Sequence, residues 1–289
     1  MSRTGTGSPD APTDRIPRPG KKRVLPEMAL GAPALASFED VALVLAWTGT
    51  DRRLNVARSP DGRSFLGKIT LDETSLDGPA LTCGSGLTYR AWTGTRYPNH
   101  LNILSSPDLQ DFRNIASTPE VRFGGRVTLD NTSPYGPALA FGNGRVYVAW
   151  ASPGASRTLN VASSGDGVHF TGEVELEEEA GGAPELAFMD GNLYVTWCGT
   201  DRSLNIMESP DGVSFGNKTT LSDGSDAHPT LARSSSGSFC LFCFGRDQER
   251  RLNILVGRTV RDLDSGMRYN ESSAAAPAVA EFRGLLHLG

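Results

Sequence analysis

The feature that most constrains the fold is a segment that occurs five times along the chain. Each copy runs from a Trp or Phe through a short polar turn to a Leu-Asn pair, and four copies continue to an Asp-containing turn and a Phe. The long second copy contains an insertion around residues 115–125. Because arrays of similar units usually close into one body, the 289 residues predict one domain. The asparagines of the five Leu-Asn pairs are Asn55, Asn102, Asn160, Asn205 and Asn253, at intervals of 47, 58, 45 and 48 residues.

Within a unit, the sequence signals are those of strands and turns. In the third unit, apolar or alternating runs at residues 136–141, 145–150, 158–163 and 169–176 are separated by turns rich in Gly, Pro and Asp, which is typical of antiparallel strands. Four strands in a unit of about 47 residues are typical of a β-propeller blade. A single blade leaves both faces of its sheet exposed, so we expect neighbouring blades to pack face to face around a closed ring.

The two ends of the chain together resemble one more unit. Residues 278–287 repeat the first strand and most of the second, and residues 23–26 align with the fourth strand of the first unit. The sequence therefore predicts a single all-β propeller of six blades, closed by N- and C-terminal strands in one sheet. The third strand of that blade is then missing or lies in the N-terminal tail. Five blades with a redundant C-terminal tail is the alternative.

Composition limits the domain boundaries and the partners. Residues 1–20 are rich in Pro, Gly, Ser and Thr and lack the apolar core of a signal peptide, so we expect a disordered tail and a propeller domain at residues 21–289. The net charge of −5, with one short basic run at residues 20–23, argues against nucleic acid as a partner. No stretch approaches the roughly 18 apolar residues of a membrane span. These features favour a cytoplasmic location, leave non-classical export open and do not fix the oligomeric state.

We expect no metal and no cofactor. The four histidines lie in different units without paired ligand spacing. Cys240 and Cys243 form a C-x-x-C pair, but they lie in an apolar run that is predicted to be a strand, which favours buried thiols over a zinc or redox site. No Gly-rich phosphate loop follows a strand and opens a helix.

The turns after the Leu-Asn strand carry a resemblance to a known family. Residues 59–65, Ser-Pro-Asp-Gly-Arg-Ser-Phe, and residues 209–215 resemble the Asp-box of bacterial sialidase-like propellers, although the Asp-box usually has one more residue between Asp and Gly. Residues 164–170 are a looser copy. The resemblance implies a propeller in which the Asp carboxylate caps a structural turn. A true sialidase is not expected, because Arg15-Ile16-Pro17 lies in the tail rather than directly before a first strand.

Residues that recur in every unit can form a repeated ligand site. In propellers the turns between second and third strands share one rim, where an aromatic face could stack on a pyranose while carboxylate and amide oxygens accept its hydroxyl hydrogens. Several weak sites on one ring give avidity, as in the propeller lectins that this arrangement resembles. The first functional prediction is therefore a glycan-binding, lectin-like propeller whose ligand is a carbohydrate or another small molecule. The competing interpretation is that each Trp packs between blades and each Asn holds a loop. The candidate ligand-binding residues are Trp47, Asp51, Asn55, Trp92, Asn102, Trp150, Asn160, Trp197, Asp201 and Asn205.

An enzyme needs one asymmetric constellation, so its residues should break the repeat. Glu185 stands on an innermost strand where other units have Ala or Thr, and His228 replaces a Gly or Ala, with Asp226 two positions before it. Arg90 replaces an aliphatic residue or Phe in a second strand. Glu185, Asp226, His228 and Arg90 are the candidate catalytic residues of the alternative function, a glycoside hydrolase or lyase with one axial site. A protein-interaction scaffold is the third possibility.

Overall fold

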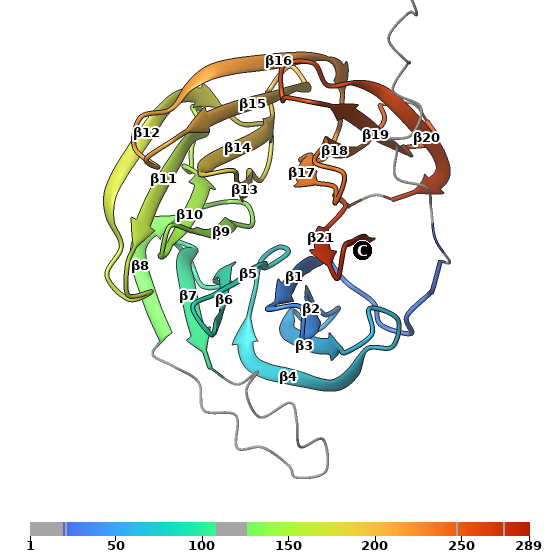
Figure 1. The fold of residues 1–289 in the computed structure, drawn as a ribbon. Helices are drawn as coiled ribbons and strands as arrows, with labels where there is room; N and C mark the ends of the chain where they lie inside the picture. The colour runs from blue at the N-terminus through green and yellow to red at the C-terminus, as the bar shows by residue number, and fades with distance from the viewer. Residues whose placement is uncertain (1–19, 21, 108–125, 247, 274) are drawn as a thin grey trace, which may run out of the picture.

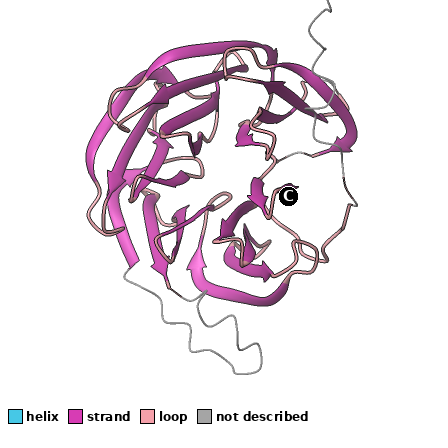
Figure 2. Ribbon diagram, in the orientation of Figure 1, coloured by secondary structure: helices cyan, strands magenta, loops and turns pink. Residues whose placement is uncertain are grey.

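The computed structural model describes residue 20 and residues 22–107, 126–246, 248–273 and 275–289. These residues form five four-stranded antiparallel sheets and one two-stranded sheet, arranged as blades around a central axis (Figures 1 and 2). The prediction of an all-β propeller is confirmed. The predicted disordered tail, apart from Gly20, and the insertion at residues 115–125 lie outside the described residues.

Each blade runs outward from the axis in the order of its strands. The first contains β1 (Ala34–Phe38), β2 (Ala42–Thr48), β3 (Arg53–Ser59) and β4 (Leu66–Thr74). The second contains β5 (Ala80–Gly84), β6 (Leu87–Thr93), β7 (His100–Ser106) and β8 (Arg126–Thr132). The third contains β9 (Ala138–Gly142), β10 (Arg145–Ala151), β11 (Thr158–Ser164) and β12 (Thr171–Glu179). The fourth contains β13 (Glu185–Met189), β14 (Asn192–Cys198), β15 (Ser203–Ser209) and β16 (Gly216–Gly224). The fifth contains β17 (Thr230–Arg233), β18 (Phe239–Phe244), β19 (Arg251–Gly257) and β20 (Asp264–Ser272), and the last pair is β21 (Val279–Phe282) and β22 (Leu285–Leu288).

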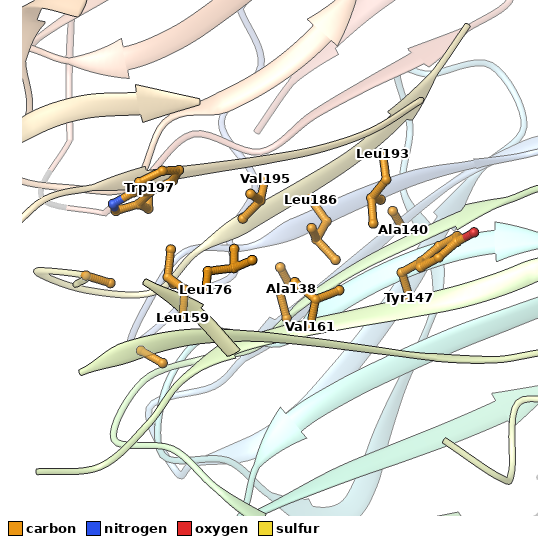
Figure 3. Close-up of a cluster of buried hydrophobic side chains, with 13 residues drawn as sticks. Ala138, Ala140, Tyr147, Leu159, Val161, Leu176, Leu186, Leu193, Val195 and Trp197 are labelled. Atoms are coloured by element: carbon orange, nitrogen blue, oxygen red, sulfur yellow. The ribbon is translucent and has the colours of Figure 1, made fainter. Parts of the chain in front are cut away.

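The apolar core lies between blades, because each sheet has a neighbour on both faces. The middle strands are therefore buried on both sides and have near-continuous apolar sequences, as in β14. Figure 3 shows one inter-blade layer, in which Tyr147 and Val161 of the third blade meet Leu186, Val195 and Trp197 of the fourth. Such layers fix each blade against the next and so build a rigid ring.

The number of complete blades is five, which corresponds to the alternative rather than to the six that the sequence favoured. The hairpin β21–β22 fills a sixth place, where β21 contacts both β17 and β1 and closes the ring of innermost strands (Figure 1). The predicted N-terminal strand at residues 23–26 is wrong, because these residues belong to no sheet. The described chain supplies no third strand for this blade, so the N-terminal segment has no strand beside it to pair with.

The Ser-Pro-Asp-Gly turns are held by their aspartates. Asp61 Oδ1 accepts hydrogen bonds from the backbone N–H of Arg63 at 2.8 Å and of Ser64 at 2.9 Å, and from the Ser59 hydroxyl at 2.9 Å. The backbone bonds to Ser64 and Arg63, with the Ser59 hydroxyl, lower the pKa of the Asp61 carboxyl to about 2. Asp166 and Asp211 make the same contacts in the third and fourth blades. The aspartate therefore acts within its own turn.

Asp61→Ala is expected to lower the melting temperature at pH 7, because two backbone N–H groups lose their acceptor. The pKa of the folded state is depressed, so this stabilisation is present above the ordinary value of 3.8 and is lost as the pH falls through about 2. Melting curves of the wild type and the variant should therefore converge towards pH 2. Equal melting temperatures at pH 7 would contradict this role.

Candidate functional site

Two cavities lie on the axis of the ring. The smaller, of about 50 Å³, lies at the rim where the links between blades enter the innermost strands, and Asp77, Glu185 and His228 line it. The larger, of about 480 Å³, continues towards the other rim among the innermost strands. Glu185 lines both cavities because it is the first residue of β13. The residue that broke the repeat therefore lies on the axis.

Glu185 and His228 face one another there. The Nδ1 atom of His228 lies 3.8 Å from Glu185 Oε2, which is too long for a hydrogen bond, and this nitrogen has no hydrogen-bond partner in the described chain. The side chain of Glu185 is 28% exposed and that of His228 is 17% exposed. Burial raises the pKa of the Glu185 carboxyl to about 8 and lowers that of the His228 imidazole to about 4, the latter against a smaller opposing effect of the Asp77 charge. Near pH 7 a neutral carboxylic acid therefore faces a neutral imidazole.

The other two candidate catalytic residues are elsewhere. Asp226 lies on the rim between the fourth and fifth blades, where its carboxylate is 3.3 Å from Arg202 Nη1 and 3.6 Å from Arg250 Nη2. Arg90 is buried in β6 and lines neither cavity. Burial raises the pKa of the neighbouring Cys83 thiol to about 12, and the charge of Arg90 opposes this rise. The structure thus brings together Glu185 and His228 but not Asp226 or Arg90.

The repeated Trp and Asn residues lie inside the blades. Trp47, Trp92, Trp150 and Trp197 are only 0–3% exposed, so no ring face is open for a sugar to stack on. In every blade with a Trp, it pairs with the Asn of the third strand. The Asn55 amide donates to the Arg53 carbonyl oxygen at 2.9 Å and its oxygen accepts from the Thr70 hydroxyl at 2.7 Å. Asn102, Asn160 and Asn205 make the corresponding bond to a carbonyl oxygen two residues earlier. This geometry agrees with the structural interpretation of these residues.

The exposed part of the repeat is the turn between the second and third strands. Asp51 and Asp201 lie at the surface there, and one carboxylate oxygen of each accepts the backbone N–H two residues later, at 3.0 and 2.9 Å. These turns share a rim with the links between blades, as expected: the Ser75 N–H, for example, donates to the Arg52 carbonyl oxygen at 2.9 Å. Asp51 and Asp201 are thus the predicted ligand-binding residues that solvent can reach.

Sequence reasoning missed a ring of arginines in the same turns. The residue just before the third strand has a left-handed backbone in all five blades, and in four it is Arg. The side chains of Arg52, Arg202 and Arg250 are exposed, and the Arg157 guanidinium lies 5.7 Å from the Tyr135 ring centre. The sequence signal was an Arg two residues before Leu-Asn in four of the five units. The φ angles are 64° at Arg52, 71° at Asn99, 45° at Arg157, 68° at Arg202 and 44° at Arg250.

Two other features, a metal-binding group and a membrane-spanning helix, are absent from the residues that the structure describes. Within the described ranges, no group of three or more His, Cys, Asp or Glu side chains could hold a metal ion. The part of the chain that the structure describes also has no helix long and apolar enough to cross a membrane.

Comparison with known proteins shows similarity at the level of the fold. No family model matches the chain, and no curated protein matches its sequence. SapL1 lectin, solved with α-methyl fucoside, is 14% identical with a TM-score of 0.62, over 91% of this chain and 88% of that one. The BP39L lectin of Burkholderia pseudomallei is 14% identical with a TM-score of 0.59, over 83% and 69%. An engineered GH43 glycoside hydrolase with endo-xylanase and exo-arabinofuranosidase activity is 15% identical with a TM-score of 0.52, over 86% and 58%. At these identities the shared property is the β-propeller.

Proposed function

We propose that this chain is a carbohydrate-binding propeller of the lectin type, with weak sites repeated on the rim that carries the turns between second and third strands. The observation that carries the proposal is the ring of arginines at Arg52, Arg157, Arg202 and Arg250. Two propellers of similar fold are described as lectins, one of them in complex with a fucoside, which supports the proposal. The proposal includes a relationship to Asp-box propellers, which the Ser-Pro-Asp-Gly turns support.

The arginines have a left-handed backbone conformation, which Gly and Asn adopt at a lower cost in free energy. A left-handed φ costs a residue with a Cβ about 1–2 kcal/mol, which Gly avoids and Asn reduces. The conformation belongs to the hairpin turn itself, since the Arg52 N–H donates to the Gly49 carbonyl oxygen at 2.8 Å and a hairpin turn of this kind commonly ends in a left-handed residue. Asn99 fills the position in the second blade, so the turn itself does not require Arg. Within the chain, Arg202 and Arg250 lie near Asp226 and Arg157 lies near the Tyr135 ring, and we infer that the exposed guanidinium groups also contact a ligand.

The chemistry of the rim suits a polyhydroxylated or anionic ligand. A guanidinium presents several N–H donors in a planar fork, which matches sugar hydroxyls and carboxylates. The aspartates supply acceptors beside Arg52 and Arg202, and Tyr97, at 93% exposure, supplies an aromatic face in the second blade. Each site would be weak alone, and repetition on a rigid ring would give tight binding to a multivalent surface.

The test is a glycan array with neutral and acidic members, probed with the wild type, Arg52→Gly, Arg202→Gly and the double variant. We expect stepwise loss, with the double variant at least about tenfold weaker on the glycans that the wild type binds, because binding through several sites amplifies the loss of each one. Gly tolerates the left-handed backbone, so the variants should keep the wild-type melting temperature or exceed it. Loss of binding therefore cannot be attributed to unfolding.

Arg283→Gly is the matched control. Arg283 has a similar φ of 53° and the same charge, but it lies in the turn of the β21–β22 hairpin, on the opposite rim. Its replacement should leave the array pattern unchanged. Unchanged binding by the Arg52→Gly/Arg202→Gly variant, or equal loss in Arg283→Gly, would overturn the rim sites.

A second candidate function rests on Glu185. A carboxylic acid with a pKa of about 8 in an axial cavity can donate a proton to a leaving group, which is the role of the general acid in a glycoside hydrolase or lyase. A panel of chromogenic glycosides tests it. Turnover by the wild type that is lost in Glu185→Gln and kept in Arg52→Gly would favour this function, and the absence of turnover of any glycoside would count against it.

A further inference from the structure

The sixth blade has an open strand edge. Ala278 and Gly289 exchange two backbone hydrogen bonds, at 3.1 and 2.9 Å. Because the bonding direction alternates along an antiparallel strand, the backbone groups of His287 also point towards β21. The N–H and C=O groups of Leu286 and Leu288 therefore point away from β21, towards the place that a third strand holds in the other blades. No described strand pairs with this edge.

Residues 22–30 occupy the outer position of the sixth blade, where the other blades have their fourth strand. Although residues 22–30 form no strand, their side chains continue the ion pairs that join the fourth strands of neighbouring blades, such as Arg126 with Glu73 at 2.7 Å. Lys22 pairs with Glu271 of the fifth blade and Glu27 pairs with Lys68 of the first. The isolated bridge between Ala29 and Gly49 corresponds to those between Ser75 and Gly94 and between Ala180 and Gly199. The segment thus lies where a fourth strand would lie, with one strand missing between it and β22.

Apolar side chains remain uncovered at this place. Five of the exposed large apolar residues of the described chain lie on its two sides, including Val24 at 84% and Leu285 at 65% exposure. The others are Met28, Leu30 and Leu288. Outer strands elsewhere carry charges that discourage further pairing, as β12 does with its run of glutamates, whereas β22 has no Lys, Arg, Asp or Glu. The edge lacks the usual protection against added strands.

The five complete blades show what such a place accepts. Each third strand is seven residues long, with Leu at its second position, Asn at its third and Val or Ile at its fourth, and both apolar side chains are buried. Residues 1–19 contain no Leu-Asn pair and only Met1 and Ile16 as large apolar residues, so their sequence does not provide this pattern. The missing pattern in residues 1–19 thus favours an occupant from another polypeptide over this segment.

We propose that the edge of β22 is a docking site for an extended segment of another protein, about seven residues long, with aliphatic side chains at its second and fourth positions. The segment runs antiparallel to β22 and completes the sixth blade by strand addition. Backbone hydrogen bonds to Leu286 and Leu288 supply affinity, and the aliphatic side chains cover the exposed apolar residues.

The probe is a fluorescent peptide with the sequence of residues 202–212, which contains the third strand of the fourth blade. It should bind the full-length protein in an anisotropy titration and slow hydrogen exchange at the amides of Leu286 and Leu288. The same peptide with Leu204→Asp and Ile206→Asp should bind at least about tenfold more weakly, since tenfold corresponds to ~1.4 kcal/mol and both aliphatic contacts are lost. No binding of the wild-type peptide would overturn the proposal.

The matched protein variants are Leu288→Pro and Leu288→Ala. Proline removes an N–H that β21 does not use, so the hairpin should persist while the peptide loses a donor and its affinity falls about tenfold or more. Alanine keeps the N–H and should bind more tightly than proline does. Equal affinity of the wild type and Leu288→Pro would overturn backbone pairing. Protection of the Leu286 and Leu288 amides before any peptide is added would also overturn the proposal, because the chain itself or a second copy would then fill the edge.

Discussion

Replacing Trp197 by alanine is expected to lower the free energy of unfolding by about 3–5 kcal/mol, the range for removing a large aromatic side chain from a close-packed core. Trp197 is fully buried in the layer between the third and fourth blades (Figure 3). Its loss leaves a cavity that two rigid sheets cannot close, because each is also held by its other neighbour. Urea unfolding monitored by circular dichroism measures the change.

Two controls separate packing from ligand binding. Trp197→Phe keeps most of the apolar volume and should cost clearly less than Trp197→Ala. Tyr97→Ala, at an exposed ring, should change stability by less than about 0.5 kcal/mol. If Trp197→Ala left stability intact and removed glycan binding, the tryptophans would be ligand contacts, as the lectin interpretation of the sequence supposed.

Between pH 6.5 and 8, the stability of the wild type is expected to fall by about 2 kcal/mol because of Glu185. The folded state holds the carboxyl proton up to about pH 8, whereas the unfolded chain has lost it well above the ordinary value of 4.5. The folded state therefore binds about one more proton than the unfolded state, and each pH unit costs about 1.4 kcal/mol. Below pH 6.5 the depressed pKa of His228 has the opposite effect, so that its contribution to stability falls as the pH falls. The reason is that the unfolded chain binds a proton at this residue near pH 6.5, whereas the folded state binds it only near pH 4.

Glu185→Gln isolates this effect, because Gln resembles the protonated acid and does not titrate. The difference in unfolding free energy between the variant and the wild type should grow as the pH rises from 6.5 to 8 and be small near pH 5. A difference that stays constant over this range would show that Glu185 is already ionised at pH 6.5, contrary to the neutral pair inferred from burial.

The sequence predicted the strands of each blade well, because a blade is built from residues that follow one another in the chain. The strands β9 to β12 lie close to the four runs identified in the third unit, since alternation and turn residues are properties of neighbouring residues. The axial position of Glu185 was also predictable, because it breaks a repeat whose other members are small or uncharged. By contrast, the burial of Trp47 and Trp197 depends on the face of the next blade, which no single unit contains.

Two further features lay beyond local reasoning. Nothing in the letters Arg-Arg-Leu-Asn shows that Arg52 has a left-handed backbone, because that conformation depends on how the second and third strands pair and close the turn between Gly49 and Arg53. Residues 23–26 matched the fourth strand in sequence and lie in its place, yet they form no strand, because a strand needs a partner and the third strand is missing. For residues 23–26, the sequence pattern therefore predicted the place of the segment in the fold correctly but its strand pairing wrongly.

The position of β21 at the C-terminal side of five blades sets the order in which the ring can form during translation. Chains emerge N-terminus first, and each blade can pack on its predecessor as it appears. β1 contacts both β5 and β21, so one face of the first blade stays exposed until residues 279–282 have left the ribosome. Until then the nascent chain is an open arc whose first and fifth blades each offer a face that fits the other end of a second arc. Translation that is slow beyond residue 272 would prolong this interval and favour exchange between nascent chains on one messenger RNA.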